Sequence, residues 1–211
     1  DLKKSIKDKI SLNPILNSFQ KTLNKYEIDY ELVNSFLKSM KSDLNKKQYL
    51  SSEEFDEYVY GSADVVGLMC LKVFVNGNTK KYEELKSFAM RLGSAFQKVN
   101  FLRDLKDDFE VLNRTYFPNT DLNQLDEESK IKIIGEIEED FKEGLNGIKK
   151  LPIEAKFGVF MAYRYYSQLL KKLKVDELRN LCKKYNIEYS ETSLLWSMKE
   201  IYTALKTQAK I

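Results

Sequence analysis

Apolar residues recur at three- and four-residue spacing almost throughout the chain, and this periodicity constrains the fold more than any other feature. Only three prolines and eight glycines interrupt the 211 residues, so the segments between breaks are long. A period of three to four residues is typical of amphipathic helices, whereas strands alternate every two residues. The sequence therefore predicts an all-α fold, and its length indicates one domain over residues 1–211.

Capping residues and breaks divide this pattern into separate helices. Asn13 precedes Pro14, which suits a side-chain cap before a proline at the first helical position. Ser51 and Glu54 have the spacing of a capping box, and the polar run 76–79 interrupts the apolar period. We expect helices over 55–74, 80–110, 126–149, 153–172, 176–185 and 192–207, with a turn region ending at Pro118 and a boundary at Pro152.

Composition excludes several classes of protein. No window approaches the roughly 20 uncharged apolar residues that a membrane span needs. The 35 basic and 32 acidic residues alternate without a basic block, so nucleic-acid binding is not indicated. Because histidine is absent, ionic chemistry falls to carboxylates, tyrosines, lysines or an oxygen-bound cation. Cys70 and Cys182 lie in apolar helical contexts, which favours free thiols and a reducing cytoplasm.

A polar stripe occupies one face of the predicted helix 80–110. At about 100° per residue, Gly93, Gln97, Asn100, Asp104 and Asp108 fall within an arc of roughly 80°. Two aspartates one turn apart are, by themselves, most often solvated surface carboxylates. This stripe, however, continues for four turns inside an apolar frame, where polar groups without partners would be costly. We therefore expect a polar ligand opposite it.

The chemistry of the stripe suits a diphosphate with Mg²⁺. Two carboxylates at positions i and i+4 repel each other unless a cation lies between them, and Mg²⁺ is held by one or two carboxylates plus phosphate oxygens. Gln97 and Asn100 can donate amide hydrogens to phosphate oxygens, and Arg103 can add a guanidinium. The stripe therefore predicts half of a Mg²⁺–diphosphate site.

A second segment, residues 58–69, combines aromatic, small and apolar residues. A helix through it places Tyr58, Ser62, Val65 and Met69 on one face, and its glycines indicate close approach of another helix. One interpretation is tight helix packing with Tyr58 as a core aromatic. The other is a cavity for a long apolar chain with a tyrosine hydroxyl at its polar end, and both can hold together.

Together these segments resemble the squalene/phytoene synthase family. The match includes Tyr-x-Tyr-Gly-x-Ala-x-x-Val-Gly-Leu-Met from Tyr58 and Leu-Gly-x-Ala-Phe-Gln-x-x-Asn-x-x-Arg-Asp-x-x-x-Asp from Leu92. The segments 36–44, 113–118, 151–152 and 166–170 extend it in the same order, so the resemblance covers roughly residues 30–173. It is most similar to bacterial phytoene synthases.

The resemblance implies roles for individual residues. Asp104, Asp108 and Asn100 would bind Mg²⁺, and Tyr58 would act in the first half-reaction. The remaining implied residues contact the diphosphate or line the apolar cavity of an isoprenoid-synthase-type helical bundle. The diphosphate contacts are Gln97, Asn100, Arg103, Arg114 and Tyr166, and the lining residues are Ser62, Val65, Val66 and Met69.

The implied reaction is head-to-head condensation of two allylic diphosphates. With two geranylgeranyl diphosphates it would proceed through a cyclopropylcarbinyl diphosphate to phytoene, in carotenoid biosynthesis. Farnesyl diphosphate would instead give dehydrosqualene or, with hydride from NADPH, squalene. Two other readings stay open, namely a non-catalytic helical module that binds diphosphates and a purely structural helical bundle. The lipophilic product would favour peripheral membrane association of a cytoplasmic protein.

Three departures from the family pattern carry their own expectations. The family's first aspartate-rich motif would lie before Asp1, so we expect this chain to lack the first helices and to be inactive alone. Asp64 stands where the family usually has glycine, and it should point away from the tyrosine face, with a packing or surface effect. The stretch 175–193 lacks the family's late basic segment, so no diphosphate contact is assigned there.

Overall fold

The computed structural model describes the backbone of residues 2–46, 48–112 and 127–184, and the side chains of 2–46, 48–104 and 131–175. These parts are helical and contain no strand, which confirms the predicted all-α fold. The helices in chain order are α1 (Leu2–Asp8), α2 (Pro14–Lys25), α3 (Tyr30–Ser42), α4 (Ser52–Val59), the π-helical turn η1 (Tyr60–Asp64), α5 (Val65–Phe74), α6 (Thr79–Leu112), α7 (Glu127–Lys150) and α8 (Ile153–Lys184).

The predicted helix starts are confirmed by their capping contacts. Asn13 Oδ1 accepts hydrogen bonds from the first backbone N–H groups of α2, with Pro14 as its first residue. Ser51 Oγ caps α4 by accepting from Glu54 N at 3.2 Å, while the Glu54 carboxylate accepts from Leu50 N, one residue before the expected partner. These side chains satisfy backbone donors that a helix start leaves free.

Two helix boundaries differ from the sequence prediction. The predicted helix 55–74 is interrupted by η1, whose wider turn makes room for close packing against α3. The segments 153–172 and 176–185, predicted as separate helices, form the continuous α8, because no glycine or proline lies between them. The predicted turn ending at Pro118 and the helix 192–207 lie outside the described residues.

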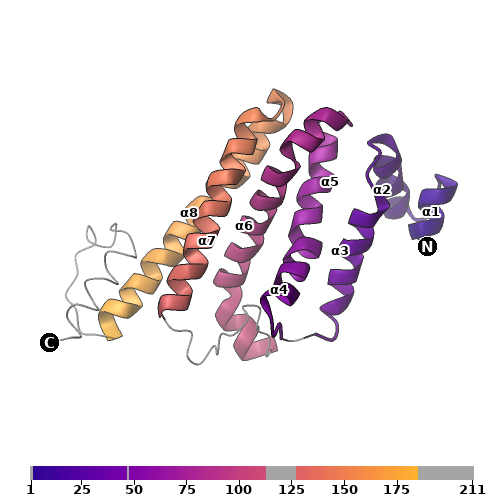
Figure 1. Ribbon diagram of the computed structural model, residues 1–211. Coiled ribbons are helices and arrows are strands. Elements are labelled where there is room, and N and C mark those ends of the chain that lie inside the picture. Colours follow the sequence, from indigo (N-terminus) through magenta and orange to yellow (C-terminus); the bar gives the residue numbers. More distant parts are fainter. Residues whose placement is uncertain (1, 47, 113–126, 185–211) are drawn as a thin grey trace.

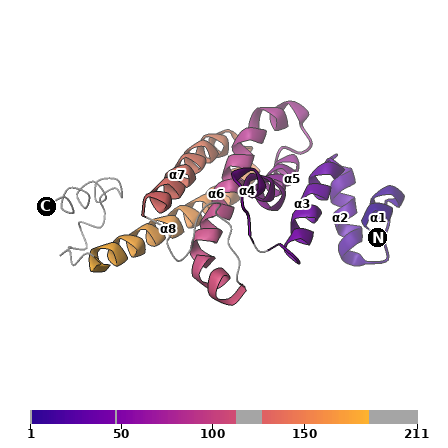
Figure 2. The same cartoon turned by 60° about the horizontal axis from the view of Figure 1, so that its bottom comes forward.

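The helices form a bundle with the long α6 at its centre. Figures 1 and 2 show α6 between α5 on one side and α7 on the other, and α8 packs against both α6 and α7. On the α5 side, α3 and α4 pack against η1, whereas α1 and α2 pack against each other at the edge of the bundle. This arrangement leaves one face of α6 enclosed by α5, α7 and α8.

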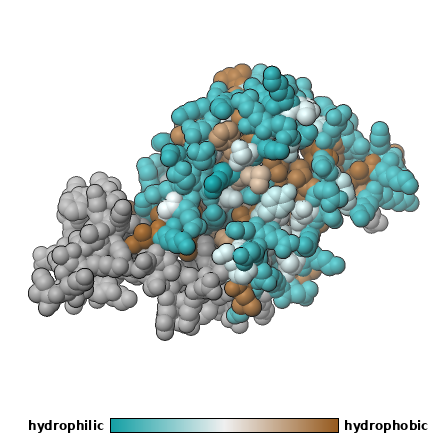
Figure 3. All heavy atoms as spheres, in the orientation of Figure 1, coloured by the Kyte–Doolittle hydropathy of each residue, from teal (hydrophilic) through white to brown (hydrophobic). Residues whose placement is uncertain are grey.

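Two apolar clusters flank the central helix. One joins α3, α5 and α6 around Val65 and Leu85, and the other joins α6, α7 and α8 around Val99 and Ile137. Figure 3 shows a mostly hydrophilic face with small groups of hydrophobic residues. Within the described helices, none has an apolar stretch long enough to cross a bilayer.

Candidate functional site

A cavity of about 590 Å³ lies between α5, α6, α7 and α8. This volume is in the range of sites for small molecules, about 300–1,000 Å³. Fifteen residues of α6 separate the lining residues Leu85 and Asn100, so at about 1.5 Å per residue the cavity is about 22 Å long. Most of its lining is apolar, which suits a long hydrocarbon chain.

Polar groups gather at one end of this cavity. Ser62 from η1, Gln97 and Asn100 from α6, and Tyr166 from α8 line that end. Phe74 and other apolar residues line the far end, with the exposed Glu154 at the start of α8. Three of the predicted diphosphate contacts, Gln97, Asn100 and Tyr166, are therefore brought together by helices far apart in the sequence. The cavity has the shape that a molecule with a polar head and an apolar tail requires.

Two buried polar atoms at this end have no hydrogen-bond partner. Ser62 Oγ can donate and accept, and Asn100 Oδ1 is an acceptor, but neither atom meets a protein partner. Leaving such a group unsatisfied costs about 1–3 kcal/mol. The complementary partner is therefore a ligand or solvent that presents an acceptor to Ser62 and a donor or cation to Asn100.

An aromatic pair forms part of the wall beside the polar end. The rings of Phe96 and Tyr166 stack with centroids 4.3 Å apart and planes inclined by 21°, and both residues line the cavity. Stacking fixes the orientation of both rings. An aromatic wall next to the polar end can also stabilise a cation, because the ring faces carry negative electrostatic potential.

Asp104 lies one helical turn beyond Asn100 on α6, outside the residues that line the cavity. The Arg103 guanidinium donates to both of its carboxylate oxygens at 2.6 Å, and this contact lowers the pKa of Asp104. Arg103 therefore lies against Asp104 rather than in the cavity. Asp108 continues the same face of α6, but its side chain lies outside the described residues, as does all of Arg114.

The oxygen atoms at the polar end could supply some, but not all, of the ligands that a hard cation needs. Asp104 supplies an exposed carboxylate and Asn100 an unpaired amide oxygen, both of which Mg²⁺ accepts. Among residues with described side chains, no group of three or more acidic, cysteine or histidine residues forms a complete metal site. A metal held here would therefore need ligands from the substrate and from further carboxylates.

Tyr58 is a core aromatic in this structure. It is 5% exposed, its ring centroid lies 4.8 Å from that of Tyr49 and 6.0 Å from that of Phe101, and it does not line the cavity. Of the two interpretations that the sequence left open, the structure therefore shows the packing role. Tyr58 lies one turn before Ser62, which does line the cavity.

The predicted lining residues divide into two groups. Ser62 and Val66 line the cavity, but Val65 and Met69 do not, because Val65 is fully buried in the α3–α5–α6 cluster and Met69 packs against it. For Val65 and Met69 the structure shows packing in the core beside the cavity. The π-turn η1 adds a residue to the helical repeat and so turns α5 by about 100° relative to α4.

Small residues of α7 and α8 also line the cavity, and the sequence analysis missed them: Gly144, Gly147, Ala155, Gly158 and Ala162. Their spacing of three or four residues is a signal that could have shown them. At Gly147 an added Cβ would lie 2.3 Å from Phe88 Cβ, so glycine there permits close helix contact. At Gly158 an added Cβ would meet nothing within 4 Å, so this glycine leaves space.

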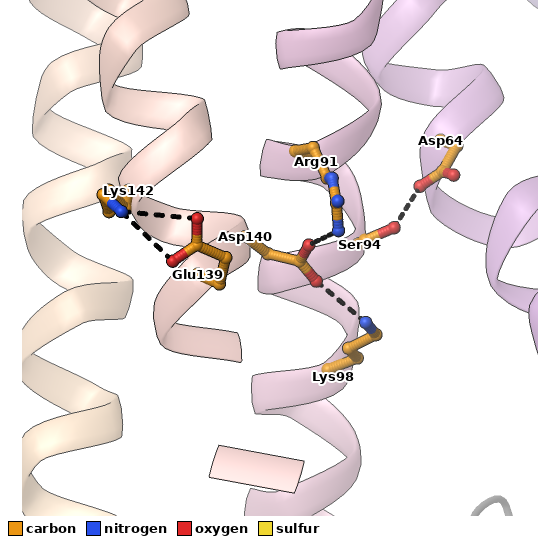
Figure 4. A network of polar contacts seen from close by, with 7 residues as sticks. All are labelled: Asp64, Arg91, Ser94, Lys98, Glu139, Asp140 and Lys142. Carbon is orange, nitrogen blue, oxygen red and sulfur yellow. Dashed lines mark hydrogen bonds and ion pairs between the residues drawn. The ribbon is translucent and has the colours of Figure 1, made fainter. Parts of the chain in front are cut away.

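A second polar cluster lies between η1, α6 and α7 (Figure 4). Asp140 of α7, 1% exposed, accepts from Arg91 at 2.5 Å and from Lys98 at 2.8 Å. Asp64 of η1 is 8% exposed and accepts from Ser94 Oγ at 2.7 Å, and burial raises the pKa of its carboxyl to about 6. Asp64, for which the sequence predicts a packing or surface effect, is therefore buried, and Asp140 was not singled out from the sequence.

Comparison with known proteins gives a consistent family signal. The model of the squalene/phytoene synthase family matches residues 2–184. Phytoene synthase 1, chloroplastic, from Zea mays is 28% identical over 180 residues, which cover 77% of this chain and 44% of that protein. The corresponding enzyme of Solanum lycopersicum is 24% identical over 187 residues, or 81% of this chain and 45% of that protein. The chain thus spans less than half the length of these relatives.

Solved structures show the same fold. The squalene synthase HpnC from Alicyclobacillus acidocaldarius superposes with a TM-score of 0.67 at 19% identity, over 81% of this chain and 68% of that one. A dehydrosqualene synthase in complex with ligand has a TM-score of 0.67 at 18% identity, over 98% of this chain and 76% of that one. At these identities the likeness concerns the fold.

Proposed function

Because the chain belongs to the squalene/phytoene synthase family, we propose that it serves the head-to-head condensation of two geranylgeranyl diphosphates to phytoene. The observation that carries this proposal is the long apolar cavity with two unpaired polar atoms, Ser62 Oγ and Asn100 Oδ1, at one end. A prenyl tail would fill the apolar length, and the diphosphate would lie at the polar end.

The length of the cavity favours a four-unit prenyl chain. An extended main chain of about sixteen carbons has about fifteen bonds, each advancing roughly 1.2 Å, and so spans about 18 Å. This length is close to the cavity's extent of about 22 Å along α6. A farnesyl chain would leave the Phe74 end empty.

The diphosphate would be held by the residues at the polar end and just beyond it. Gln97 and Tyr166 would donate hydrogen bonds to its oxygens, while Arg103, and Arg114 outside the described residues, would add positive charge. Asp104, Asp108 and Asn100 would hold Mg²⁺, which supplies the positive charge that stabilises a departing diphosphate. For this, Arg103 would have to turn from Asp104 toward the diphosphate.

The cavity wall would protect the reactive chain after ionisation. A prenyl chain against this apolar lining would be shielded from water that could otherwise capture a carbocation. The stacked rings of Phe96 and Tyr166 would stabilise positive charge near the polar end. We also propose that Tyr58 takes part in the first half-reaction, although its packed ring limits it to an indirect route through Phe101 and its neighbours.

Turnover should need more carboxylates than the described side chains present. The described side chains include no cluster of three or more metal-binding residues, and a single carboxylate pair suffices for binding rather than for ionising two substrates. We therefore propose that the chain alone binds a prenyl diphosphate without converting it. A cytoplasmic location with peripheral membrane association would suit the lipophilic product of the whole reaction.

Two alternatives keep the same site. Squalene or dehydrosqualene synthesis would use farnesyl diphosphate, with NADPH required only for squalene. A non-catalytic module that binds diphosphates is favoured by the single carboxylate set among the described residues.

Binding and product analysis with a series of diphosphates tests the proposal. We expect affinity to rise from inorganic diphosphate through farnesyl to geranylgeranyl diphosphate, because each further unit buries apolar surface. Equal affinity for inorganic diphosphate and geranylgeranyl diphosphate would show that the tail lies outside the cavity and would refute the proposal. Phytoene formed by the isolated chain would refute its predicted inactivity.

A further inference from the structure

The cluster that contains Asp64 lies directly behind the polar end of the cavity. On α6, Gly93 and Gln97 line the cavity, whereas Arg91, Ser94 and Lys98 project from a different side of the same two turns. Because successive residues of a helix are rotated by about 100°, these two sets of side chains face different neighbours. None of the cluster's side chains lines the cavity. Their hydrogen bonds join η1 and α7 to the two turns of α6 that carry Gly93 and Gln97.

The α7 half of the cluster is a closed ion-pair set. The Asp140 carboxylate is almost completely buried, and Arg91 and Lys98 each donate to one of its oxygens. Lys98 is 14% exposed, so this pair is shielded from solvent, while Arg91 reaches the surface with 56% of its side chain exposed. Arg91 and Lys98 of α6 are thus both paired with Asp140 and join α6 to α7.

The η1 half depends on one hydrogen bond. Ser94 Oγ donates to Asp64 Oδ1 at 2.7 Å, which ties the end of the π-turn to α6. The backbones also meet here, since a Cβ on Gly93 would lie 2.9 Å from the carbonyl oxygen of Ala63. Ser62 and Ala63, the residues just before Asp64, line the cavity. Any shift of Asp64 relative to Ser94 therefore moves cavity-lining residues.

The charge of Asp64 is balanced by few groups. Lys98 and Arg91 attract it and Asp140 repels it, but both cations are already paired with Asp140. Ser94 is the neighbour that donates a hydrogen bond to its carboxylate. Burial with so little compensation is what raises the pKa of Asp64 to about 6. A buried carboxylate of this kind destabilises a fold, so a positional role would explain it.

We propose that Asp64 and Ser94 are positioning residues: their hydrogen bond seats the π-turn η1 on α6 and so places Ser62 at the polar end of the cavity. The Asp140 ion pairs join α7 to α6, and the Asp64–Ser94 hydrogen bond joins η1 to the same two turns of α6. Protonation of Asp64 alters the contact with Ser94, because a protonated carboxyl also donates, whereas a carboxylate only accepts. The ligand-binding consequence rests on the proposed function, whereas the placement of η1 does not.

Amide NMR of the ligand-free chain from about pH 5 to pH 8 tests the placement directly. We expect the Ser62 and Ala63 signals to titrate with a midpoint near pH 6, and to lose this step in Asp64→Asn, whose amide oxygen still accepts from Ser94. Asp56→Asn, at an exposed position of α4, is the matched control and should keep the step. No titration at Ser62 and Ala63, or the same titration in Asp64→Asn, would overturn the proposal.

A binding measurement extends the test to the cavity. With geranylgeranyl thiodiphosphate and Mg²⁺ at pH 7.5, we expect Ser94→Ala to weaken binding about tenfold and Asp64→Asn to change it less than about twofold. If the hydrogen bond has only a structural role, Ser94→Ala will lower the midpoint of urea unfolding and leave the affinity unchanged. That result would refute the positional role. If neither wild type nor any variant binds the ligand, the proposed function fails. The NMR titration still tests whether the Asp64–Ser94 contact positions η1.

Discussion

At the scale of single residues, Asp64 combines burial with a single hydrogen bond from Ser94. Its carboxyl has a pKa of about 6 in the folded chain and an ordinary value of 3.8. Because the folded state binds the proton more tightly, the contribution of Asp64 to stability is fully present below pH 4 and is lost as pH rises through 6. The charged form therefore destabilises the protein near neutral pH.

Asp64→Asn should stabilise the chain only where Asp64 is ionised. At pH 7.5 we expect the free energy of unfolding to rise by about 1–3 kcal/mol, because the amide keeps the contact with Ser94 without a buried charge. Near pH 4 the difference should shrink toward zero. Urea unfolding at both pH values measures this, and an equal gain at the two would show that charge is not the cause.

Ser62 offers a second residue-scale test, because its hydroxyl is buried without a partner. Ser62→Ala should leave the ligand-free chain equally stable or raise its unfolding free energy by up to about 1 kcal/mol. The same variant should bind geranylgeranyl thiodiphosphate several-fold more weakly. Ser87→Ala, at an exposed site on α6, is the control for both measurements. Unchanged affinity in Ser62→Ala would show that the Ser62 hydroxyl does not contribute to ligand binding.

At the scale of elements, the π-turn η1 explains why part of the site was not predictable from the sequence. Capping residues such as Asn13 and Ser51 act locally, so the starts of α2 and α4 could be predicted. The wider turn at η1 depends on packing of Gly61 against α3, which no local pattern encodes. For that reason the cavity side of α5 carries Val66 and Cys70 rather than Val65 and Met69, one residue away from the positions that a regular helix predicts.

Gly61→Ala should disrupt this packing. The added Cβ would lie 2.0 Å from Ser39 Oγ and 2.8 Å from the carbonyl oxygen of Ser35, so α3 would have to move. We expect a loss of about 1–3 kcal/mol in unfolding free energy. Gly135→Ala in α7 is the control, since its Cβ meets nothing within 4 Å and alanine should stabilise the helix by up to about 1 kcal/mol. Similar effects at both positions would contradict the close packing of η1 on α3.

At the scale of the whole molecule, the site exists because four helices from distant parts of the sequence surround one cavity. The periodic pattern identified the face of α6 that carries Gln97 and Asn100, but not the glycines of α7 and α8 across from it. Which helices pair is decided by tertiary packing rather than by any single segment. The bundle and one wall of the site were therefore predictable, and the opposite wall was not.

Gly158→Leu should shorten the usable cavity. Gly158 lines the cavity and an added Cβ there meets nothing within 4 Å, so a leucine should obstruct a tail without straining the fold. We expect geranylgeranyl diphosphate to bind at least about tenfold more weakly, with a smaller loss for farnesyl diphosphate. Calorimetric titration of both ligands measures this, and an equal loss for the two would contradict a length-dependent cavity.

The central claim is that the Asp104 face of α6 and the cavity together hold a prenyl diphosphate through Mg²⁺. Calorimetric titration with geranylgeranyl thiodiphosphate, with Mg²⁺ or with chelator, tests it in wild type, in Asp104→Asn combined with Asp108→Asn, and in the control Asp56→Asn. We predict Mg²⁺-dependent binding in wild type and control, and a loss of about tenfold or more in the double variant. An affinity that is the same with Mg²⁺ and with chelator, or a double variant that binds as tightly as wild type, would contradict the claim.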